Sequence, residues 1–150
     1  MPNNNSIKLH RVIKTTPEKV FRAFADADAK ASWLPPYGFV CTVQEHAFRE
    51  GSGYKMAFTN FTTGSRQSFG GTFTKITPNE YIQYSDTFDD PNLPGTMNTM
   101  VTLKAVPGGT ELTIIQENIP EMIPASMCYL GWQESLEKLI KLVEPNIPDA

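Results

Sequence analysis

Apolar and polar residues alternate along seven segments of this chain and recur at helical spacing in three others. The alternating segments are 7–13, 39–48, 54–59, 69–74, 82–88, 97–106 and 110–118. A period of two is typical of a strand with one buried face. Short turns rich in Gly and Pro join most of these segments, so the strands are predicted to pair antiparallel.

The longest helical pattern covers residues 124–144. Its apolar positions recur every three to four residues and are Cys128, Trp132, Leu136, Leu139, Ile140 and Val143. Charged and amide side chains occupy the opposite side. A wide apolar stripe on a long helix has to be covered, and the predicted sheet is the only part of the chain large enough to cover it.

Two short helices are predicted between the first strand and the second. Thr16 is placed to cap the first helix with Pro17 at its first position, and a capping box of Thr15 with Glu18 is the alternative. Asp26 or Asp28 begins the second helix, which runs through Trp33 and ends before Pro35–Pro36. The pattern predicts one α+β domain spanning residues 1–150.

Composition narrows the classes of partner. The net charge is −3, which does not attract nucleic acid or an anionic membrane. No apolar run approaches the ~20 residues that span a bilayer, and residues 1–6 lack a signal-peptide pattern. Cys41 and Cys128 are expected to be reduced, with a disulfide between them as the alternative. We therefore expect a cytoplasmic protein, either monomer or homodimer.

Motifs for metal or covalent chemistry are weak. His10 and His46 lie on different predicted strands with no further ligands at metal-binding spacing. Cys128 lies near a helix N-terminus, which lowers a thiol pKa, but a buried, unreactive cysteine is the favoured interpretation. We expect no metal, no cofactor and no catalytic residue.

Asp86 is the one acid with the strand parity of apolar neighbours. It alternates in step with Ile82, Tyr84 and Phe88. Facing inward it would have a raised pKa and serve as a general acid or base. A solvated position near the end of its strand is the favoured interpretation.

Apolar and aromatic residues form the richest candidate set. Ligand pockets are mostly apolar, with a few polar groups that orient the ligand. A filled core without a cavity is the alternative. The candidate ligand-binding residues are Trp33, Tyr54, Met56, Phe58, Phe69, Phe73, Tyr84, Asp86, Met97, Gln116, Asn118, Met127 and Trp132.

Several local motifs resemble those of one known family. They are residues 16–24 (TPEKVFRAF), 33–39 (WLPPYGF), 49–54 (REGSGY), 109–113 (GTELT) and Gly131-Trp132 with its following leucines. Together they resemble the START-like, or SRPBCC, superfamily, and within it the homologues of the activator of the heat-shock protein 90 ATPase. The resemblance implies a helix-grip fold, in which a curved antiparallel sheet of about seven strands wraps around the long C-terminal helix.

The resemblance also implies three functional readings. The first is binding of a small hydrophobic molecule, such as a lipid, polyketide or flavonoid, between the sheet and the last helix. The second is a chaperone-linked module that interacts with another protein. The third is a cyclase- or hydrolase-type enzyme, for which Asp86 with Tyr54 or Tyr84 is the best available constellation.

Overall fold

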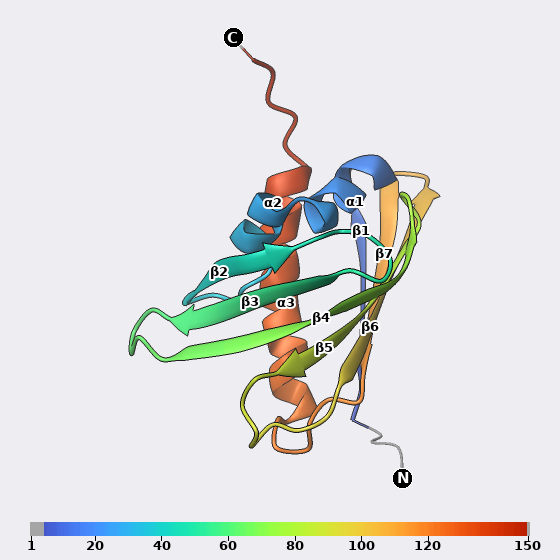
Figure 1. Cartoon of the computed structure of the whole chain (residues 1–150). Coiled ribbons are helices and arrows are strands. Elements are labelled where there is room, and N and C mark those ends of the chain that lie inside the picture. The colour runs from blue at the N-terminus through green and yellow to red at the C-terminus, as the bar shows by residue number, and fades with distance from the viewer. Residues whose placement is uncertain (1–4, 150) are drawn as a thin grey trace.

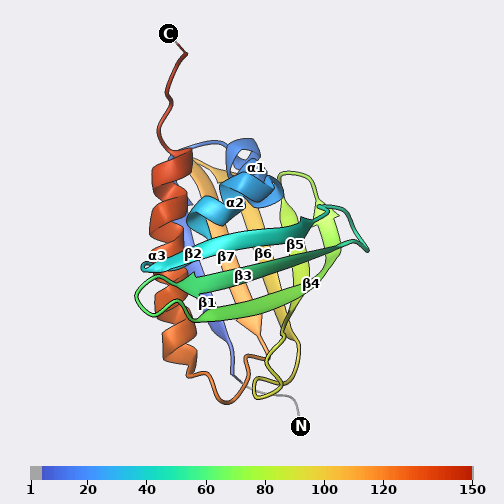
Figure 2. The same cartoon turned by 60° about the vertical axis from the view of Figure 1, so that its left-hand side comes forward.

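The computed structural model describes residues 5–149, and its strands form one seven-stranded antiparallel sheet. The strands are β1 (Ile7–Ile13), β2 (Phe39–His46), β3 (Gly53–Asn60), β4 (Arg66–Thr77), β5 (Tyr81–Phe88), β6 (Met97–Val106) and β7 (Gly109–Glu117). Their order in the sheet is β1-β7-β6-β5-β4-β3-β2. The sheet is strongly curved, so that β2, β3 and β4 run across the direction of β1 and β7 (Figures 1 and 2). The predicted helix-grip architecture is confirmed.

Three helices accompany the sheet: α1 (Pro17–Ala25), α2 (Ala27–Trp33) and α3 (Ala125–Val143). The side chain of Thr16 accepts a hydrogen bond from the backbone N–H of Lys19, so the single cap forms rather than the capping box. Asp26, not Asp28, caps α2 by accepting from the backbone N–H of Ala29. Within residues 5–149, no helix is both long and apolar enough to cross a membrane.

Helix α3 approaches the sheet along one edge only. Among the described elements it comes close to β1, α1 and α2, and it buries Trp132, Leu136, Leu139 and Val143. Of the predicted apolar stripe, Cys128 and Ile140 are only partly buried. The backbone of α3 therefore stands away from strands such as β4 and β5 (Figure 2).

Hydrogen bonds tie α3 to the segment that follows α2. Ser135 Oγ donates to the carbonyl of Leu34 at 2.5 Å, and Lys138 Nζ donates to the carbonyl of Pro35 at 2.8 Å. The hydroxyl of Tyr37 donates to the carboxylate of Glu137. These bonds hold the middle of the helix near the start of β2.

Two glycines in β4 allow neighbouring backbones to approach closely. A Cβ at Gly71 would lie 1.9 Å from the carbonyl oxygen of Ser85, and one at Gly70 would lie 2.6 Å from that of Tyr54. The pairing of β4 with β5 also shifts register between Phe73 and Lys75. Glycine in a strand interior marks such close approaches, and here it accompanies the bend of the sheet.

We predict that Gly71→Ala lowers the free energy of unfolding by about 2–3 kcal/mol, because the added methyl group collides with backbone that cannot move aside. Gly131→Ala is the matched control. Its Cβ would meet no atom within 4 Å, and alanine favours a helix by up to about 1 kcal/mol. Urea unfolding monitored by tryptophan fluorescence measures both changes. A Gly71→Ala protein as stable as wild type would contradict the argument.

Candidate functional site

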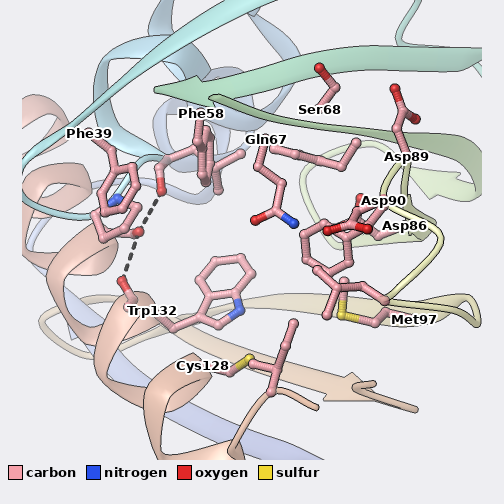
Figure 3. A pocket seen from close by; sticks show the side chains of 18 of the residues that line it. Phe39, Phe58, Gln67, Ser68, Asp86, Asp89, Asp90, Met97, Cys128 and Trp132 are labelled. Atoms are coloured by element: carbon pink, nitrogen blue, oxygen red, sulfur yellow. Dashed lines mark hydrogen bonds between the residues drawn. The ribbon is translucent and has the colours of Figure 1, made fainter. Parts of the chain in front are cut away.

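A cavity of about 1010 Å³ lies between α3, α2 and the concave face of the sheet. Ligand pockets span roughly 300–1,000 Å³, so this cavity is at the upper end of that range. Phe58, Gln67, Met97, Cys128 and Trp132 surround its open centre in Figure 3. The cavity occupies the space that α3 leaves by approaching the sheet only along β1.

Three small residues of α3 face the cavity beside the larger Met127 and Trp132. Cys128, Gly131 and Ser135 lie three and four residues apart, which places them on one side of the helix, and all three line the cavity. A Cβ at Gly131 would meet no atom within 4 Å. These small side chains leave room in the cavity beside the larger side chains of Met127 and Trp132.

Nine of the thirteen predicted binding residues line the cavity. They come from β3, β4, β5, β6, β7 and α3, and they are Tyr54, Phe58, Phe69, Tyr84, Asp86, Met97, Gln116, Met127 and Trp132. Their convergence follows from strand parity, since residues two apart on a strand point to the same face. A role for each in contacting a ligand stays a prediction.

Three other predicted residues do not line the cavity because they are fully buried. Trp33, Met56 and Phe73 belong to the hydrophobic core. Trp33 Nε1 donates to the carbonyl of Ala23 at 2.9 Å, which fixes the indole under α1. Met56 and Phe73 have the predicted parity, but neighbouring side chains cover them completely.

Asn118 is the fourth exception, and it is exposed. Strand β7 ends at Glu117, so the alternation that would turn Asn118 inward stops one residue earlier. Its backbone adopts a positive φ of 60°. Its side-chain amide donates to the carbonyl of Thr96 at 2.7 Å. The side chain therefore joins two chain segments and does not face the cavity.

Gln116 lines the cavity, but both ends of its amide are already bonded. Its Nε2 donates to Thr99 Oγ1 at 3.1 Å. Its Oε1 accepts from Trp132 Nε1 at 3.2 Å. The amide thus orients the indole of Trp132 as part of the cavity wall.

A buried lysine on the cavity wall was not predicted. Lys30 of α2 is only 1% exposed and lines the cavity. Its Nζ lies 5.0 Å from the ring centroids of Tyr54 and Tyr84 and 5.3 Å from that of Phe73. These distances are within the reach of cation–π attraction. Its place three residues before Trp33, on the same side of a helix, was the available signal.

Asp86 lines the cavity and remains partly exposed, two residues before β5 ends at Phe88. Its Oδ1 accepts a hydrogen bond from the hydroxyl of Tyr54 at 2.7 Å. The same hydroxyl lies 3.0 Å from the carbonyl oxygen of Ser85. Asp86 and Lys30 thus place an acid and a base on the same aromatic wall.

Comparison with known families decides where this fold belongs. The family described as activator of Hsp90 ATPase homolog 1-like protein matches residues 14–144. The chain belongs to this family. It is therefore a member of the START-like superfamily, and its membership supports a module that binds a ligand or acts as an activator-like partner.

Three solved structures of other bacterial proteins share the fold. Protein CV1439 from Chromobacterium violaceum is 52% identical, with a TM-score of 0.94 over 95% of this chain and 99% of that one. A protein from Rhodobacter sphaeroides is 19% identical, with a TM-score of 0.80 over 95% and 94%. An AHSA1-like protein from Aeromonas hydrophila is 21% identical, with a TM-score of 0.75 over 93% and 92%. None of the curated proteins matches this chain.

In this member of the activator of Hsp90 ATPase homolog 1-like family, burial shifts the pKa of Lys30 and that of Asp86 in opposite directions. Burial lowers the Lys30 pKa to about 8, against the raising effect of Asp86. Burial raises the Asp86 pKa to about 6, against the lowering effects of Tyr54 and Lys30. Near pH 7 the ammonium and the carboxylate are therefore both charged, and their charges cancel.

The thiol of Cys128 has a raised pKa because burial disfavours the thiolate. The raised pKa agrees with the favoured interpretation of an unreactive, partly buried cysteine and not with the reactive-thiol alternative. Cys128 and Cys41 are both free thiols. Across residues 5–149, no three His, Cys, Asp or Glu side chains gather as a metal ion would require.

We predict that Lys30→Met removes a pH dependence of stability at alkaline pH. The unfolded lysine stays protonated up to 10.5, whereas the folded one releases its proton near pH 8. Between these values the unfolded state binds more protons, so the free energy of unfolding rises with pH. From about pH 7.5 to about pH 9.5, wild type should gain about 2 kcal/mol relative to the variant.

Urea unfolding at both pH values measures this difference. Lys104→Met is the matched control, because Lys104 is exposed, and it should follow wild type. Identical pH dependence in wild type and Lys30→Met would show that the lysine is not buried in solution.

Proposed function

We propose that this protein binds a small, largely apolar molecule in the cavity between α3 and the sheet. The observation that carries the proposal is the cavity itself, about 1010 Å³ in volume and lined by aromatic side chains from four adjacent strands, β2 to β5. Interiors are normally packed with few voids larger than a water molecule. The protein also has a packed hydrophobic core. A cavity of this size beside that core fits a site that holds a ligand.

Met127 and Met97 support the same proposal. Both line the cavity. Met127 is 62% exposed and stands at the rim, whereas Met97 is buried within. Methionine adapts its shape to what it contacts, so these side chains suit a ligand that enters past the start of α3.

Native mass spectrometry of protein purified gently from its own host tests the proposal. We expect a discrete added mass on wild type that is lost on denaturation. Gly131→Phe should lack this mass, because the ring would project from α3 into the cavity. Gly131→Ala is the control and should keep it. Circular dichroism verifies that both variants fold.

Apolar compounds should also raise the melting temperature of wild type through preferential binding to the native state. They should raise that of Gly131→Phe by much less. Wild type that carries no added mass and gains no stability from any apolar compound would contradict a ligand-binding function.

An interaction module is the second candidate, and one surface favours it. Met122, Met127 and Leu130, around the start of α3, are 74%, 62% and 49% exposed. Exposed apolar groups that gather in one place mark interaction sites. Stoichiometric capture of a protein by wild type, abolished by Leu130→Glu but unaffected by Gly131→Phe, would favour this candidate over the cavity.

A further inference from the structure

We propose that the ligand is uncharged and carries two adjacent oxygen groups at its polar end, one accepting a hydrogen bond from Lys30 and one donating a hydrogen bond to Asp86. Molecules of this class include planar diols of the catechol type and hydroxyaryl ketones. The inference rests on the proposed function, because it names the chemistry of the molecule that the cavity takes.

Most polar side chains on the buried part of the cavity wall are already bonded within the protein. The Gln116 amide is bonded at both ends, and its oxygen accepts from the indole of Trp132. The single hydroxyl hydrogen of Ser135 is engaged by the backbone, because its Oγ lies 2.5 Å from the carbonyl oxygen of Leu34 and 2.9 Å from that of Gly131. These groups shape the wall and leave little capacity for a ligand.

Lys30 keeps its hydrogen-bonding capacity. An ammonium has three N–H donors, and no residue among 5–149 accepts a hydrogen bond or forms an ion pair with this Nζ. Its contacts are the faces of Tyr54, Tyr84 and Phe73. Ring faces stabilise the charge but do not replace an oxygen acceptor. Because Lys30 lines the cavity, the N–H donors of its ammonium are available to an oxygen of the ligand.

Asp86 keeps part of its capacity as well. A carboxylate accepts at two oxygens, and within the described chain only the hydroxyl of Tyr54 donates to it, at Oδ1. Its second oxygen is left for a donor in the cavity that Asp86 lines. A hydroxyl group of the ligand has the required chemistry.

The charges select an uncharged ligand. Lys30 and Asp86 make no direct ion pair, but their formal charges sum to zero near pH 7, and an anionic ligand would leave a net negative charge beside the carboxylate of Asp86. A buried charge without its own partner is strongly disfavoured. The other charged residues that line the cavity, Arg66, Asp89 and Asp90, are exposed or partly exposed at its outer part.

The shape of the wall favours a planar body. Phe58 and Phe69 meet edge to face with ring centroids 4.8 Å apart, and Trp132 faces the same cavity. Aromatic rings pack best against other flat rings in offset or edge-to-face arrangements. A fused bicyclic ring is therefore a suitable probe.

Four naphthalenes with one ring system test the inference by isothermal titration. They are 2,3-dihydroxynaphthalene, 2,3-dimethoxynaphthalene, 2,3-dimethylnaphthalene and 3-hydroxy-2-naphthoate. The diol both accepts and donates, the diether only accepts, the hydrocarbon does neither, and the naphthoate brings a negative charge. We expect the diol to bind at least about tenfold more tightly than each of the other three.

Two variants assign the preference to its residues. In Lys30→Met and in Asp86→Asn, the ratio of the Kd of the hydrocarbon to that of the diol should fall about tenfold or more. Lys104→Met, at an exposed position, should keep the wild-type ratio. Because each ratio compares two probes on the same protein, a general loss of stability does not imitate the effect.

The outcomes separate this inference from the proposed function. Equal affinities for the diol and the hydrocarbon would overturn the inference while the cavity remained a binding site. Tightest binding of the naphthoate would overturn the requirement for an uncharged ligand. Failure of all four probes, together with an unliganded protein from the host, would overturn the proposed function itself.

Discussion

Helix α3 packs against the β1 edge of the sheet, and the site depends on this attachment. Its stripe of Trp132, Leu136, Leu139 and Val143 is buried, while bonds to Leu34 and Pro35 hold its middle near the start of β2. A curved sheet held in this way has a concave face that one helix cannot cover. Helices α1 and α2 cover one end of that face (Figure 2). The cavity lies beside them, between α3 and the sheet.

The electrostatics follow from the same geometry. Because α2 closes one end of the concave face, Lys30 projects among rings that belong to β3, β4 and β5. Burial at this end lowers the pKa of Lys30 and raises that of Asp86, so the two pKa values move toward each other. Structures that are 19–21% identical keep the fold, which shows that the frame tolerates extensive change in sequence.

Much of the fold was predictable because its signals are local. Alternation of apolar and polar residues identified the strands. Thr16 and Pro17, which are neighbours in the sequence, identified the start of α1. The parity of Tyr54, Phe58, Tyr84 and Asp86 also identified part of the cavity wall. Parity cannot tell a residue on a wall from one beneath it, which is why Met56 and Phe73 were misplaced. Lys30 escaped prediction because its burial depends on strands that lie far along the chain.

At Gly131 the size of the cavity can be changed without changing the packing that stabilises the fold. Residues that determine the size of an interior space usually also carry the packing that keeps the molecule folded, so enlarging or shrinking the space threatens the fold. Here the space beyond Gly131 is open, while the anchoring residues of α3 lie on another side of the helix. Side chains of increasing size at this one position would therefore limit the size of a ligand that fits the cavity, while the fold stays intact. Single substitutions at this position would then change which sizes of ligand such a cavity accepts.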